Sequence, residues 1–165
     1  MPEYIGFALA LDGRDGIARA RGWKEVASAN AFLREYTLPA EIVVAGAYRT
    51  QRIAFTADSI LAVLDVADPA TIARGENIRN AMDPTPLIES LGPADAKRAE
   101  AEIKFRKFLG ERIVKDETVR PQGDEAFGAH LTVARSISNV ASHPGKTFYG
   151  CAYRMEMLGR DGKPL

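Results

Sequence analysis

The chain has 165 residues, of which 46% are hydrophobic and 27% are charged, and its 22 basic residues balance 22 acidic ones. This length and composition are typical of one globular domain and argue against a disordered chain. A formal net charge of zero gives no general attraction to nucleic acid or to an anionic membrane, and it gives little repulsion between copies. We therefore expect a protein partner or self-association, with a small-molecule ligand as the alternative, and we expect neither a nucleic-acid nor a membrane partner.

Cys151 is the only cysteine, so the chain can form neither an internal disulfide nor a thiolate metal site. This usage fits a reducing cytoplasm, and we predict a soluble cytoplasmic protein with no cofactor and no metal. The apolar run at residues 4–11 has no positive charge before it and is too short to span a membrane. It therefore predicts a strand and not a signal peptide.

The N-terminal residues predict a β-hairpin. Residues 4–11 and 17–23 flank a glycine-containing turn at 12–16, and two such runs around a turn of this length are typical of a hairpin. A helix that begins at residue 15 is the competing interpretation, although Gly16 and Gly22 both weaken it.

The middle of the chain predicts strands between helices. Residues 24–36 have the composition of a helix, and residues 41–56 predict either a second hairpin or one bent strand. Thr56–Asp58 can cap a helix that runs to about residue 66. A further helix is expected from Asp68 to about residue 82, because an aspartate followed by a proline is a typical helix start.

The last part of the chain predicts one long helix and two strands. A short helical turn at 87–91 precedes the strongest helix, at 94–110, and residues 115–125 predict a loop. Strands are predicted at 127–137 and 147–158. The glycine-rich turn at 159–163 has no return strand after it, so the chain either ends as an exposed turn or is the N-terminal part of a longer protein.

These elements together predict a single α+β domain over residues 1–165. Its largely antiparallel sheet consists of the N-terminal hairpin, the middle strands and the two C-terminal strands. A block of helices covers this sheet, because runs of strands and runs of helices without strict alternation are typical of this class.

The predicted strand at 127–137 carries the strongest candidate for chemistry. Strand alternation places His130 and Thr132 on one face, where an imidazole and a hydroxyl can together donate to a phosphate or carbonyl oxygen. The imidazole can also act as a general acid or base. We therefore name His130 and Thr132 as candidate catalytic residues. The simpler alternative is that His130 is a structural histidine on a sheet face.

The segment His130-Leu131-Thr132 resembles the His-x-Thr strand element of the 2H phosphoesterases. This resemblance implies an activity on a phosphate ester, with His130 as acid or base. That family uses two such elements, one in each half of the chain. Here no histidine precedes residue 130, and the nearest analogue, Ala54-Phe55-Thr56, lacks the imidazole. The family's catalytic pair is therefore absent.

The candidate binding residues are three arginines and the second histidine, namely Arg49, Arg52, Arg135 and His143. Arginines of the first third can form an anion-binding patch if their strands are neighbours, and Arg14, Arg19 and Arg21 add to this group. Arg135 lies on the face opposite His130 unless the strand bulges. His143 is a turn residue that becomes interesting only if its loop folds over His130.

No complete catalytic set is visible, so our first hypothesis is a non-enzymatic binding or assembly module that makes protein–protein contacts. Such a module would use an apolar patch around Met155 and Met157, or an edge strand. The alternative is a small enzyme that acts on a phosphate ester or an acyl substrate through His130 and Thr132. A third hypothesis, nucleic-acid binding through the arginines of the first third, predicts binding that weakens steeply with salt.

Overall fold

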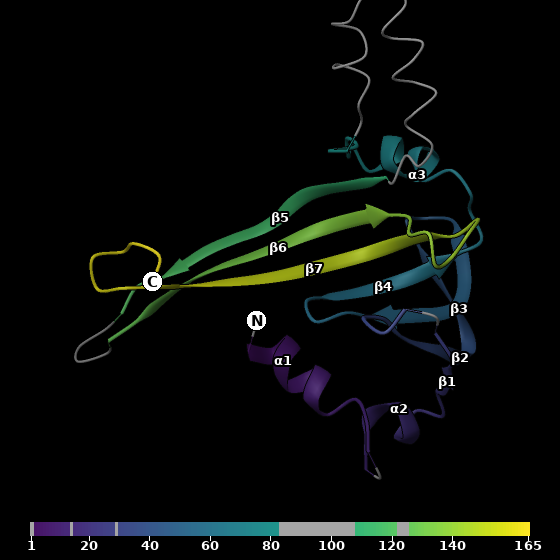
Figure 1. Ribbon diagram of the computed structural model, residues 1–165, viewed down its shortest axis with the longest axis horizontal. Coiled ribbons are helices and arrows are strands. Elements are labelled where there is room, and N and C mark those ends of the chain that lie inside the picture. Colours follow the sequence, from purple (N-terminus) through teal and green to yellow (C-terminus); the bar gives the residue numbers. More distant parts are fainter. Residues whose placement is uncertain (1, 14, 29, 83–107, 122–125) are drawn as a thin grey trace, which may run out of the picture.

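The computed structural model describes residues 2–13, 15–28, 30–82, 108–121 and 126–165. Its strands form one antiparallel sheet of seven strands in the order β1-β2-β3-β4-β7-β6-β5 (Figure 1). The strands are β1 (Lys24–Val26), β2 (Arg34–Val44), β3 (Tyr48–Phe55), β4 (Ser59–Leu64), β5 (Leu109–Val119), β6 (Gly128–Ser138) and β7 (Thr147–Leu158). The helices are α1 (Pro2–Leu9), α2 (Ile17–Ala20) and α3 (Ala70–Gly75).

The predicted α+β class is wrong, because the described residues form a mostly β structure with three short helices and no block of helices. Residues 24–36 hold β1 and the start of β2, and the predicted helix after Asp58 is β4. The apolar run in β4 is buried on both faces of the sheet, and periodicity alone does not separate such a strand from a buried helix. The predicted turn at 87–91 and most of the helix at 94–110 lie outside the described residues. None of the helices in the described ranges is long and apolar enough to cross a membrane.

The predicted N-terminal hairpin is also wrong, because α1 and α2 occupy its two halves. Tyr4 and Phe7 are spaced three residues apart, so helix α1 brings them to one face, and Leu11 follows just after the helix. The Tyr4 ring stacks on Tyr153 with 4.7 Å between centroids, and the Phe7 ring lies 5.8 Å from that of Phe55. Packing against the sheet therefore decides the conformation of this segment.

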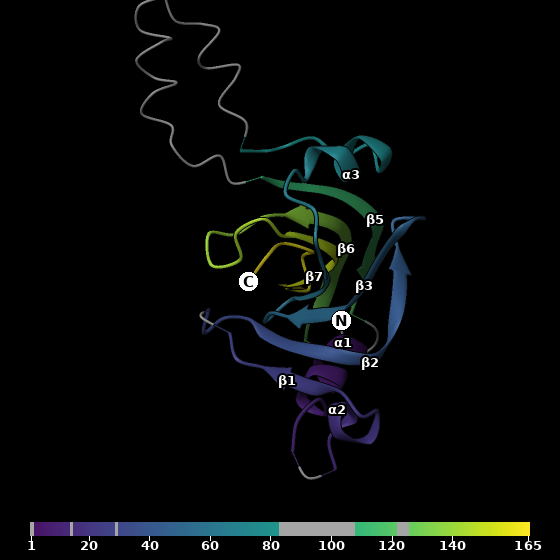
Figure 2. The ribbon, with the colours of Figure 1, turned by 90° about the vertical axis from the view of Figure 1, so that its right-hand side faces the viewer.

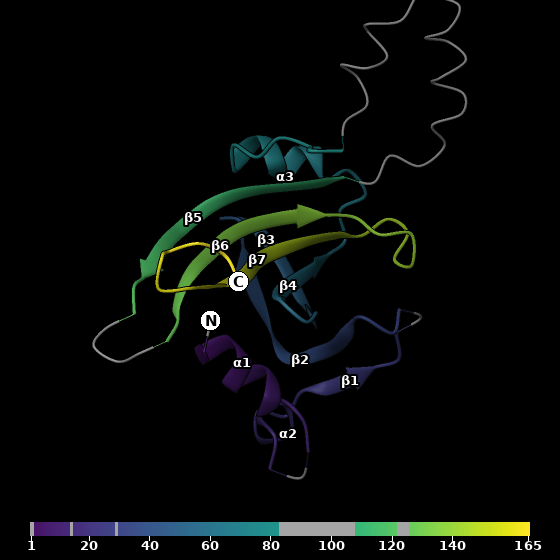
Figure 3. The same cartoon turned by 60° about the vertical axis from the view of Figure 1, so that its left-hand side comes forward.

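All three helices lie on one face of the sheet, which we call the helix-covered face. The α1 and α2 cluster buries Leu11 and Ala18 against Tyr36 and Phe55, and the α3 cluster buries Ile72 against β4, β6 and β7. The ladder between β2 and β3 shifts register between Thr37 and Ile42. Beyond this irregularity the two strands curl toward α3 (Figure 2), so the sheet is strongly curved. Figure 3 shows α1 and α2 at one end of the sheet and α3 at the other.

Loops cover the opposite face, which we call the loop-covered face. Here Leu33, Ala54 and Phe148 form a buried cluster, and Val140 of the β6–β7 loop packs against it. The strands β5, β6 and β7 extend beyond the end of β4, whose pairing with β7 ends at Ser59 and Ala152. We call this extension, residues 115–119, 128–133 and 153–158, the outer ribbon.

Candidate functional site

His130 lies near the middle of the outer ribbon, between two carboxylates from the neighbouring strands. Its Nε2 atom is 2.8 Å from Oδ1 of Asp116 on β5, and its Nδ1 atom is 4.0 Å from a carboxylate oxygen of Glu156 on β7. About a third of the His130 side chain is exposed, and both carboxylates are more exposed still. Because the pairs are solvated, they orient the imidazole and contribute little to stability.

His130 and Thr132 border the same open cleft of about 530 Å³, together with Asp58 of the β3–β4 turn and several residues of β7. The ladder places Thr132 opposite Asp116 and Arg154. An imidazole held by a carboxylate beside a hydroxyl can take part in general acid–base chemistry. The candidate catalytic pair therefore shares a cleft and gains Asp116 as an orienting group.

The four predicted binding residues do not form one site. Arg49 is 3.6 Å from Glu41 at the surface, and Arg52 forms an ion pair with Glu35, so both of these arginines are paired with carboxylates. Arg135 lies on the helix-covered face, where its guanidinium stacks over the ring of Tyr149 at 5.2 Å. It is therefore separated from His130 by the sheet.

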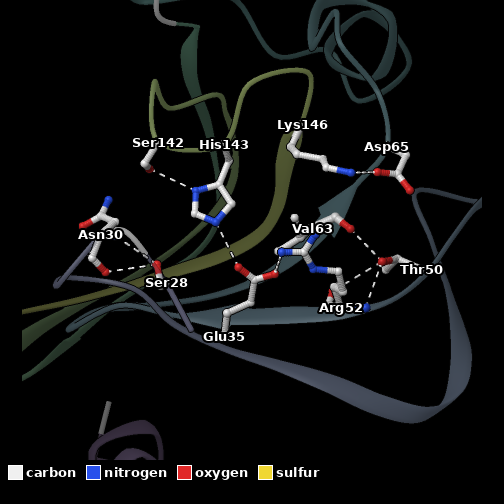
Figure 4. Close-up of polar contacts among 10 residues, drawn as sticks. All are labelled: Ser28, Asn30, Glu35, Thr50, Arg52, Val63, Asp65, Ser142, His143 and Lys146. Atoms are coloured by element: carbon white, nitrogen blue, oxygen red, sulfur yellow. Dashed lines mark hydrogen bonds and ion pairs between the residues drawn. The ribbon is translucent and has the colours of Figure 1, made fainter. Parts of the chain in front are cut away.

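His143 does not fold over His130 and instead meets Glu35 on the loop-covered face (Figure 4). Its Nε2 atom is 2.9 Å from Oε2 of Glu35, and its Nδ1 atom is 3.0 Å from the hydroxyl of Ser142. Glu35 is 1% exposed and the side chain of His143 is 10% exposed. The histidine ring also packs edge-on against Phe148.

We interpret the cluster of Glu35, Arg52 and His143 as a structural contact that holds the β6–β7 loop against the sheet. A buried carboxylate is costly unless it is paired and hydrogen-bonded. Oε1 of Glu35 forms an ion pair with Arg52 from β3 but makes no hydrogen bond, and Oε2 is hydrogen-bonded to His143 from the loop. The cluster thereby holds the loop over the apolar residues beneath it.

The two faces of the outer ribbon differ in chemistry. The ladder places the polar side chains of Asp116, Thr118, His130, Thr132, Arg154 and Glu156 on the loop-covered side. It places Val119, Ala129, Leu131, Val133, Met155 and Met157 on the other side, which we call the apolar ribbon face. Val119, Met155 and Met157 are 39–44% exposed. Tyr4 of α1 stacks on Tyr153, the neighbour of Met155 along this side of β7.

The outer edge of β5 is poorly suited to pair with another strand. A bulge between Ile113 and Lys115 breaks its alternation, and charged residues follow at Asp116 and Glu117. Bulges and charges are the devices that protect edge strands from pairing. The apolar ribbon face is therefore the better contact surface.

Comparisons of the chain with protein-family models, with curated proteins and with solved structures give no match. The sequence reasoning missed Asp116 and Glu35 because their roles depend on contacts across the fold. The sequence predicts a loop at Asp116 and a helix at Glu35. Each of these two runs also holds other acidic residues, so an acidic side chain there does not identify a site.

Proposed function

We propose that this protein is a non-enzymatic assembly module that makes protein–protein contacts through the apolar ribbon face. The observation that carries this proposal is the row of apolar side chains on that face, with Val119, Met155 and Met157 about two-fifths exposed. Contiguous apolar surface of this kind marks interaction sites in soluble proteins. The single thiol, Cys151, supports a cytoplasmic location for the module.

The partner that fits this face is a second copy of the chain. The charged side chains that β5 adds to this side of the ribbon are Lys115 and Glu117, which form an ion pair at 2.7 Å. Their opposite charges cancel on this face, and the whole chain has a formal net charge of zero. Two copies can approach without net repulsion, and methionine side chains adapt readily to an opposing apolar surface.

Sedimentation velocity over a range of concentrations tests this proposal. We expect the wild-type mass to rise with concentration and Met157→Glu to weaken association about tenfold or more, because a buried unpaired carboxylate is costly. Val43→Glu is the matched control, since Val43 is an exposed apolar residue of β2, remote from the ribbon. A monomeric wild type at every concentration, or equal effects of the two variants, contradicts the proposal.

A second candidate function is an enzyme that acts on a phosphate ester or acyl substrate. It is favoured by the 2.8 Å contact that orients His130 toward Asp116 at the rim of the cleft shared with Thr132. In this function His130 is the acid or base and Thr132 donates to the substrate oxyanion. Turnover of a phosphodiester that persists unchanged in His130→Ala excludes this assignment.

A further inference from the structure

One row of side chains crosses the helix-covered face from β5 to β4. The strand register places its members opposite one another, and they are Arg112, Arg135, Cys151 and Ile60. On β7 the row lies between Tyr153, which stacks on α1, and Tyr149, which donates to Glu76 just after α3. Arg135, Cys151 and Ile60 remain partly exposed, so the contacts with the two helices do not bury this row completely.

The two arginines of this row differ in how their charges are balanced. They are direct partners in the β5–β6 ladder, and like charges in opposite positions are unfavourable. Arg112 donates from Nε to the Glu76 carbonyl at 3.0 Å and pairs with the Glu76 carboxylate at 3.3 Å. Among the ion pairs formed within the described residues, none includes Arg135. The charge of Arg135 is therefore the one that this part of the face leaves unbalanced.

The contacts of Arg135 hold its guanidinium in place but do not neutralise it. Nη1 donates to Sγ of Cys151 at 3.6 Å, and the guanidinium lies 5.2 Å from the centre of the Tyr149 ring. Its Nε atom is buried and has no hydrogen-bond acceptor among the described residues. A partly buried cation is costly without a counter-charge and acceptors. Arg135 is thus oriented toward an anion that the described part of the chain does not supply.

We propose that Arg135 binds the carboxylate of a small organic acid whose apolar body lies across Cys151 and Ile60. A guanidinium recognises a carboxylate through two parallel hydrogen bonds. The local set of Arg112, Arg135 and Glu76 carries one net positive charge, which matches one carboxylate better than a doubly charged phosphate. Neighbouring strands lie about 4.8 Å apart, so Ile60 is about 10 Å from Arg135 across the sheet, a span suited to a chain of about six carbons.

Titration calorimetry of the full chain with hexanoate tests the site. We expect saturable one-to-one binding that Arg135→Gln weakens about tenfold or more, because the charged donor pair is lost. Arg135→Lys keeps the charge without the paired donors, and we expect a loss of about threefold. Arg49→Gln is the matched control at an exposed, carboxylate-paired arginine, and it is expected to leave the affinity within about twofold. 1-Hexanol, which has the same body and no charge, is expected to bind at least about tenfold more weakly.

This inference goes beyond the assembly proposal, because Arg135, Cys151 and Ile60 lie outside the apolar ribbon face. Met157→Glu, which is expected to weaken self-association, is therefore expected to leave the affinity for hexanoate within about twofold. Sedimentation velocity of Arg135→Gln is in turn expected to match the wild type. The two proposals can thus fail separately.

Three results overturn the carboxylate site. The first is no hexanoate binding at millimolar ligand by a wild type whose circular dichroism shows a folded chain. The second is an equal loss of affinity in Arg135→Gln and Arg49→Gln, which shows general charge attraction. The third is equal binding of hexanoate and 1-hexanol, or tighter binding of inorganic phosphate than of hexanoate, because either result shows that the site does not select a carboxylate.

Discussion

At the scale of single residues, the most consequential side chain is Glu35, a carboxylate that is 1% exposed within a β-sheet protein. Its charge is balanced by Arg52 from the neighbouring strand, and its Oε2 atom lies 2.9 Å from Nε2 of His143 in a loop 108 residues later in the chain. The folded state tolerates a buried charge whose partners are in place. Removal of that charge leaves its partner charge uncompensated, which strongly destabilises the folded state. Glu35 therefore links the two halves of the sequence.

Replacement of Glu35 by glutamine is expected to lower the free energy of unfolding by about 3 kcal/mol, because the Arg52 guanidinium loses its counter-charge. Urea unfolding followed by circular dichroism measures this loss. Glu41→Gln on the same strand is the control, and its exposed pair with Arg49 predicts a change below about 0.5 kcal/mol. Similar decreases in the free energy of unfolding of the two variants would show that Glu35 does not hold the loop in place.

Tyr149 gives a prediction for alkaline pH. Burial, followed by donation of the phenol to Glu76 at 2.7 Å, raises the pKa of Tyr149 to about 12. A pKa above the unfolded value of 10 means that this stability is complete below pH 10 and is lost as the pH rises toward 12. The free energy of unfolding of Tyr149→Phe is therefore expected to fall less steeply than that of the wild type above pH 10. Parallel pH profiles for the two proteins would contradict this assignment.

At the scale of elements, the junction of β4 and β7 joins the two groups of strands, β1–β4 and β7–β5. Gly150 lies opposite Leu61 in this ladder. A Cβ atom at Gly150 would lie 1.9 Å from the carbonyl oxygen of Ile60, so the backbones approach closely here. The junction thus depends on a residue with no side chain.

Gly150→Ala is expected to destabilise the fold by about 2 kcal/mol or more, because the backbones of β4 and β7 must separate. Gly75→Ala is the matched control at the end of α3, where a Cβ atom meets nothing within 4 Å. That change is expected to be neutral or to stabilise by up to about 1 kcal/mol. Thermal unfolding of both variants measures the contrast, and a Gly150→Ala protein as stable as Gly75→Ala would refute the close approach.

At the scale of the whole molecule, the C-terminal strands were the most predictable part of the fold. The predicted strands at 127–137 and 147–158 are confirmed by β6 and β7, because their long segments have few helix signals and end at clear turns. The N-terminal hairpin and the block of helices were wrong, since local propensity there yields to packing. The shared face of His130 and Thr132 followed from strand alternation. The contacts of Asp116 and Glu35 could not be predicted, because a single sequence does not show which residues face each other on neighbouring strands.

The central claim is that the apolar ribbon face binds a second copy of the chain. The chain has four methionines, and two of them, Met155 and Met157, lie on this face. Methyl NMR spectra of the carbon-13-labelled methionines at increasing protein concentration test the claim most directly. We predict that the signals of Met155 and Met157 shift with concentration, while that of Met82, which is 52% exposed, stays fixed. Spectra that do not change with concentration, or a shift confined to Met82, would contradict the account.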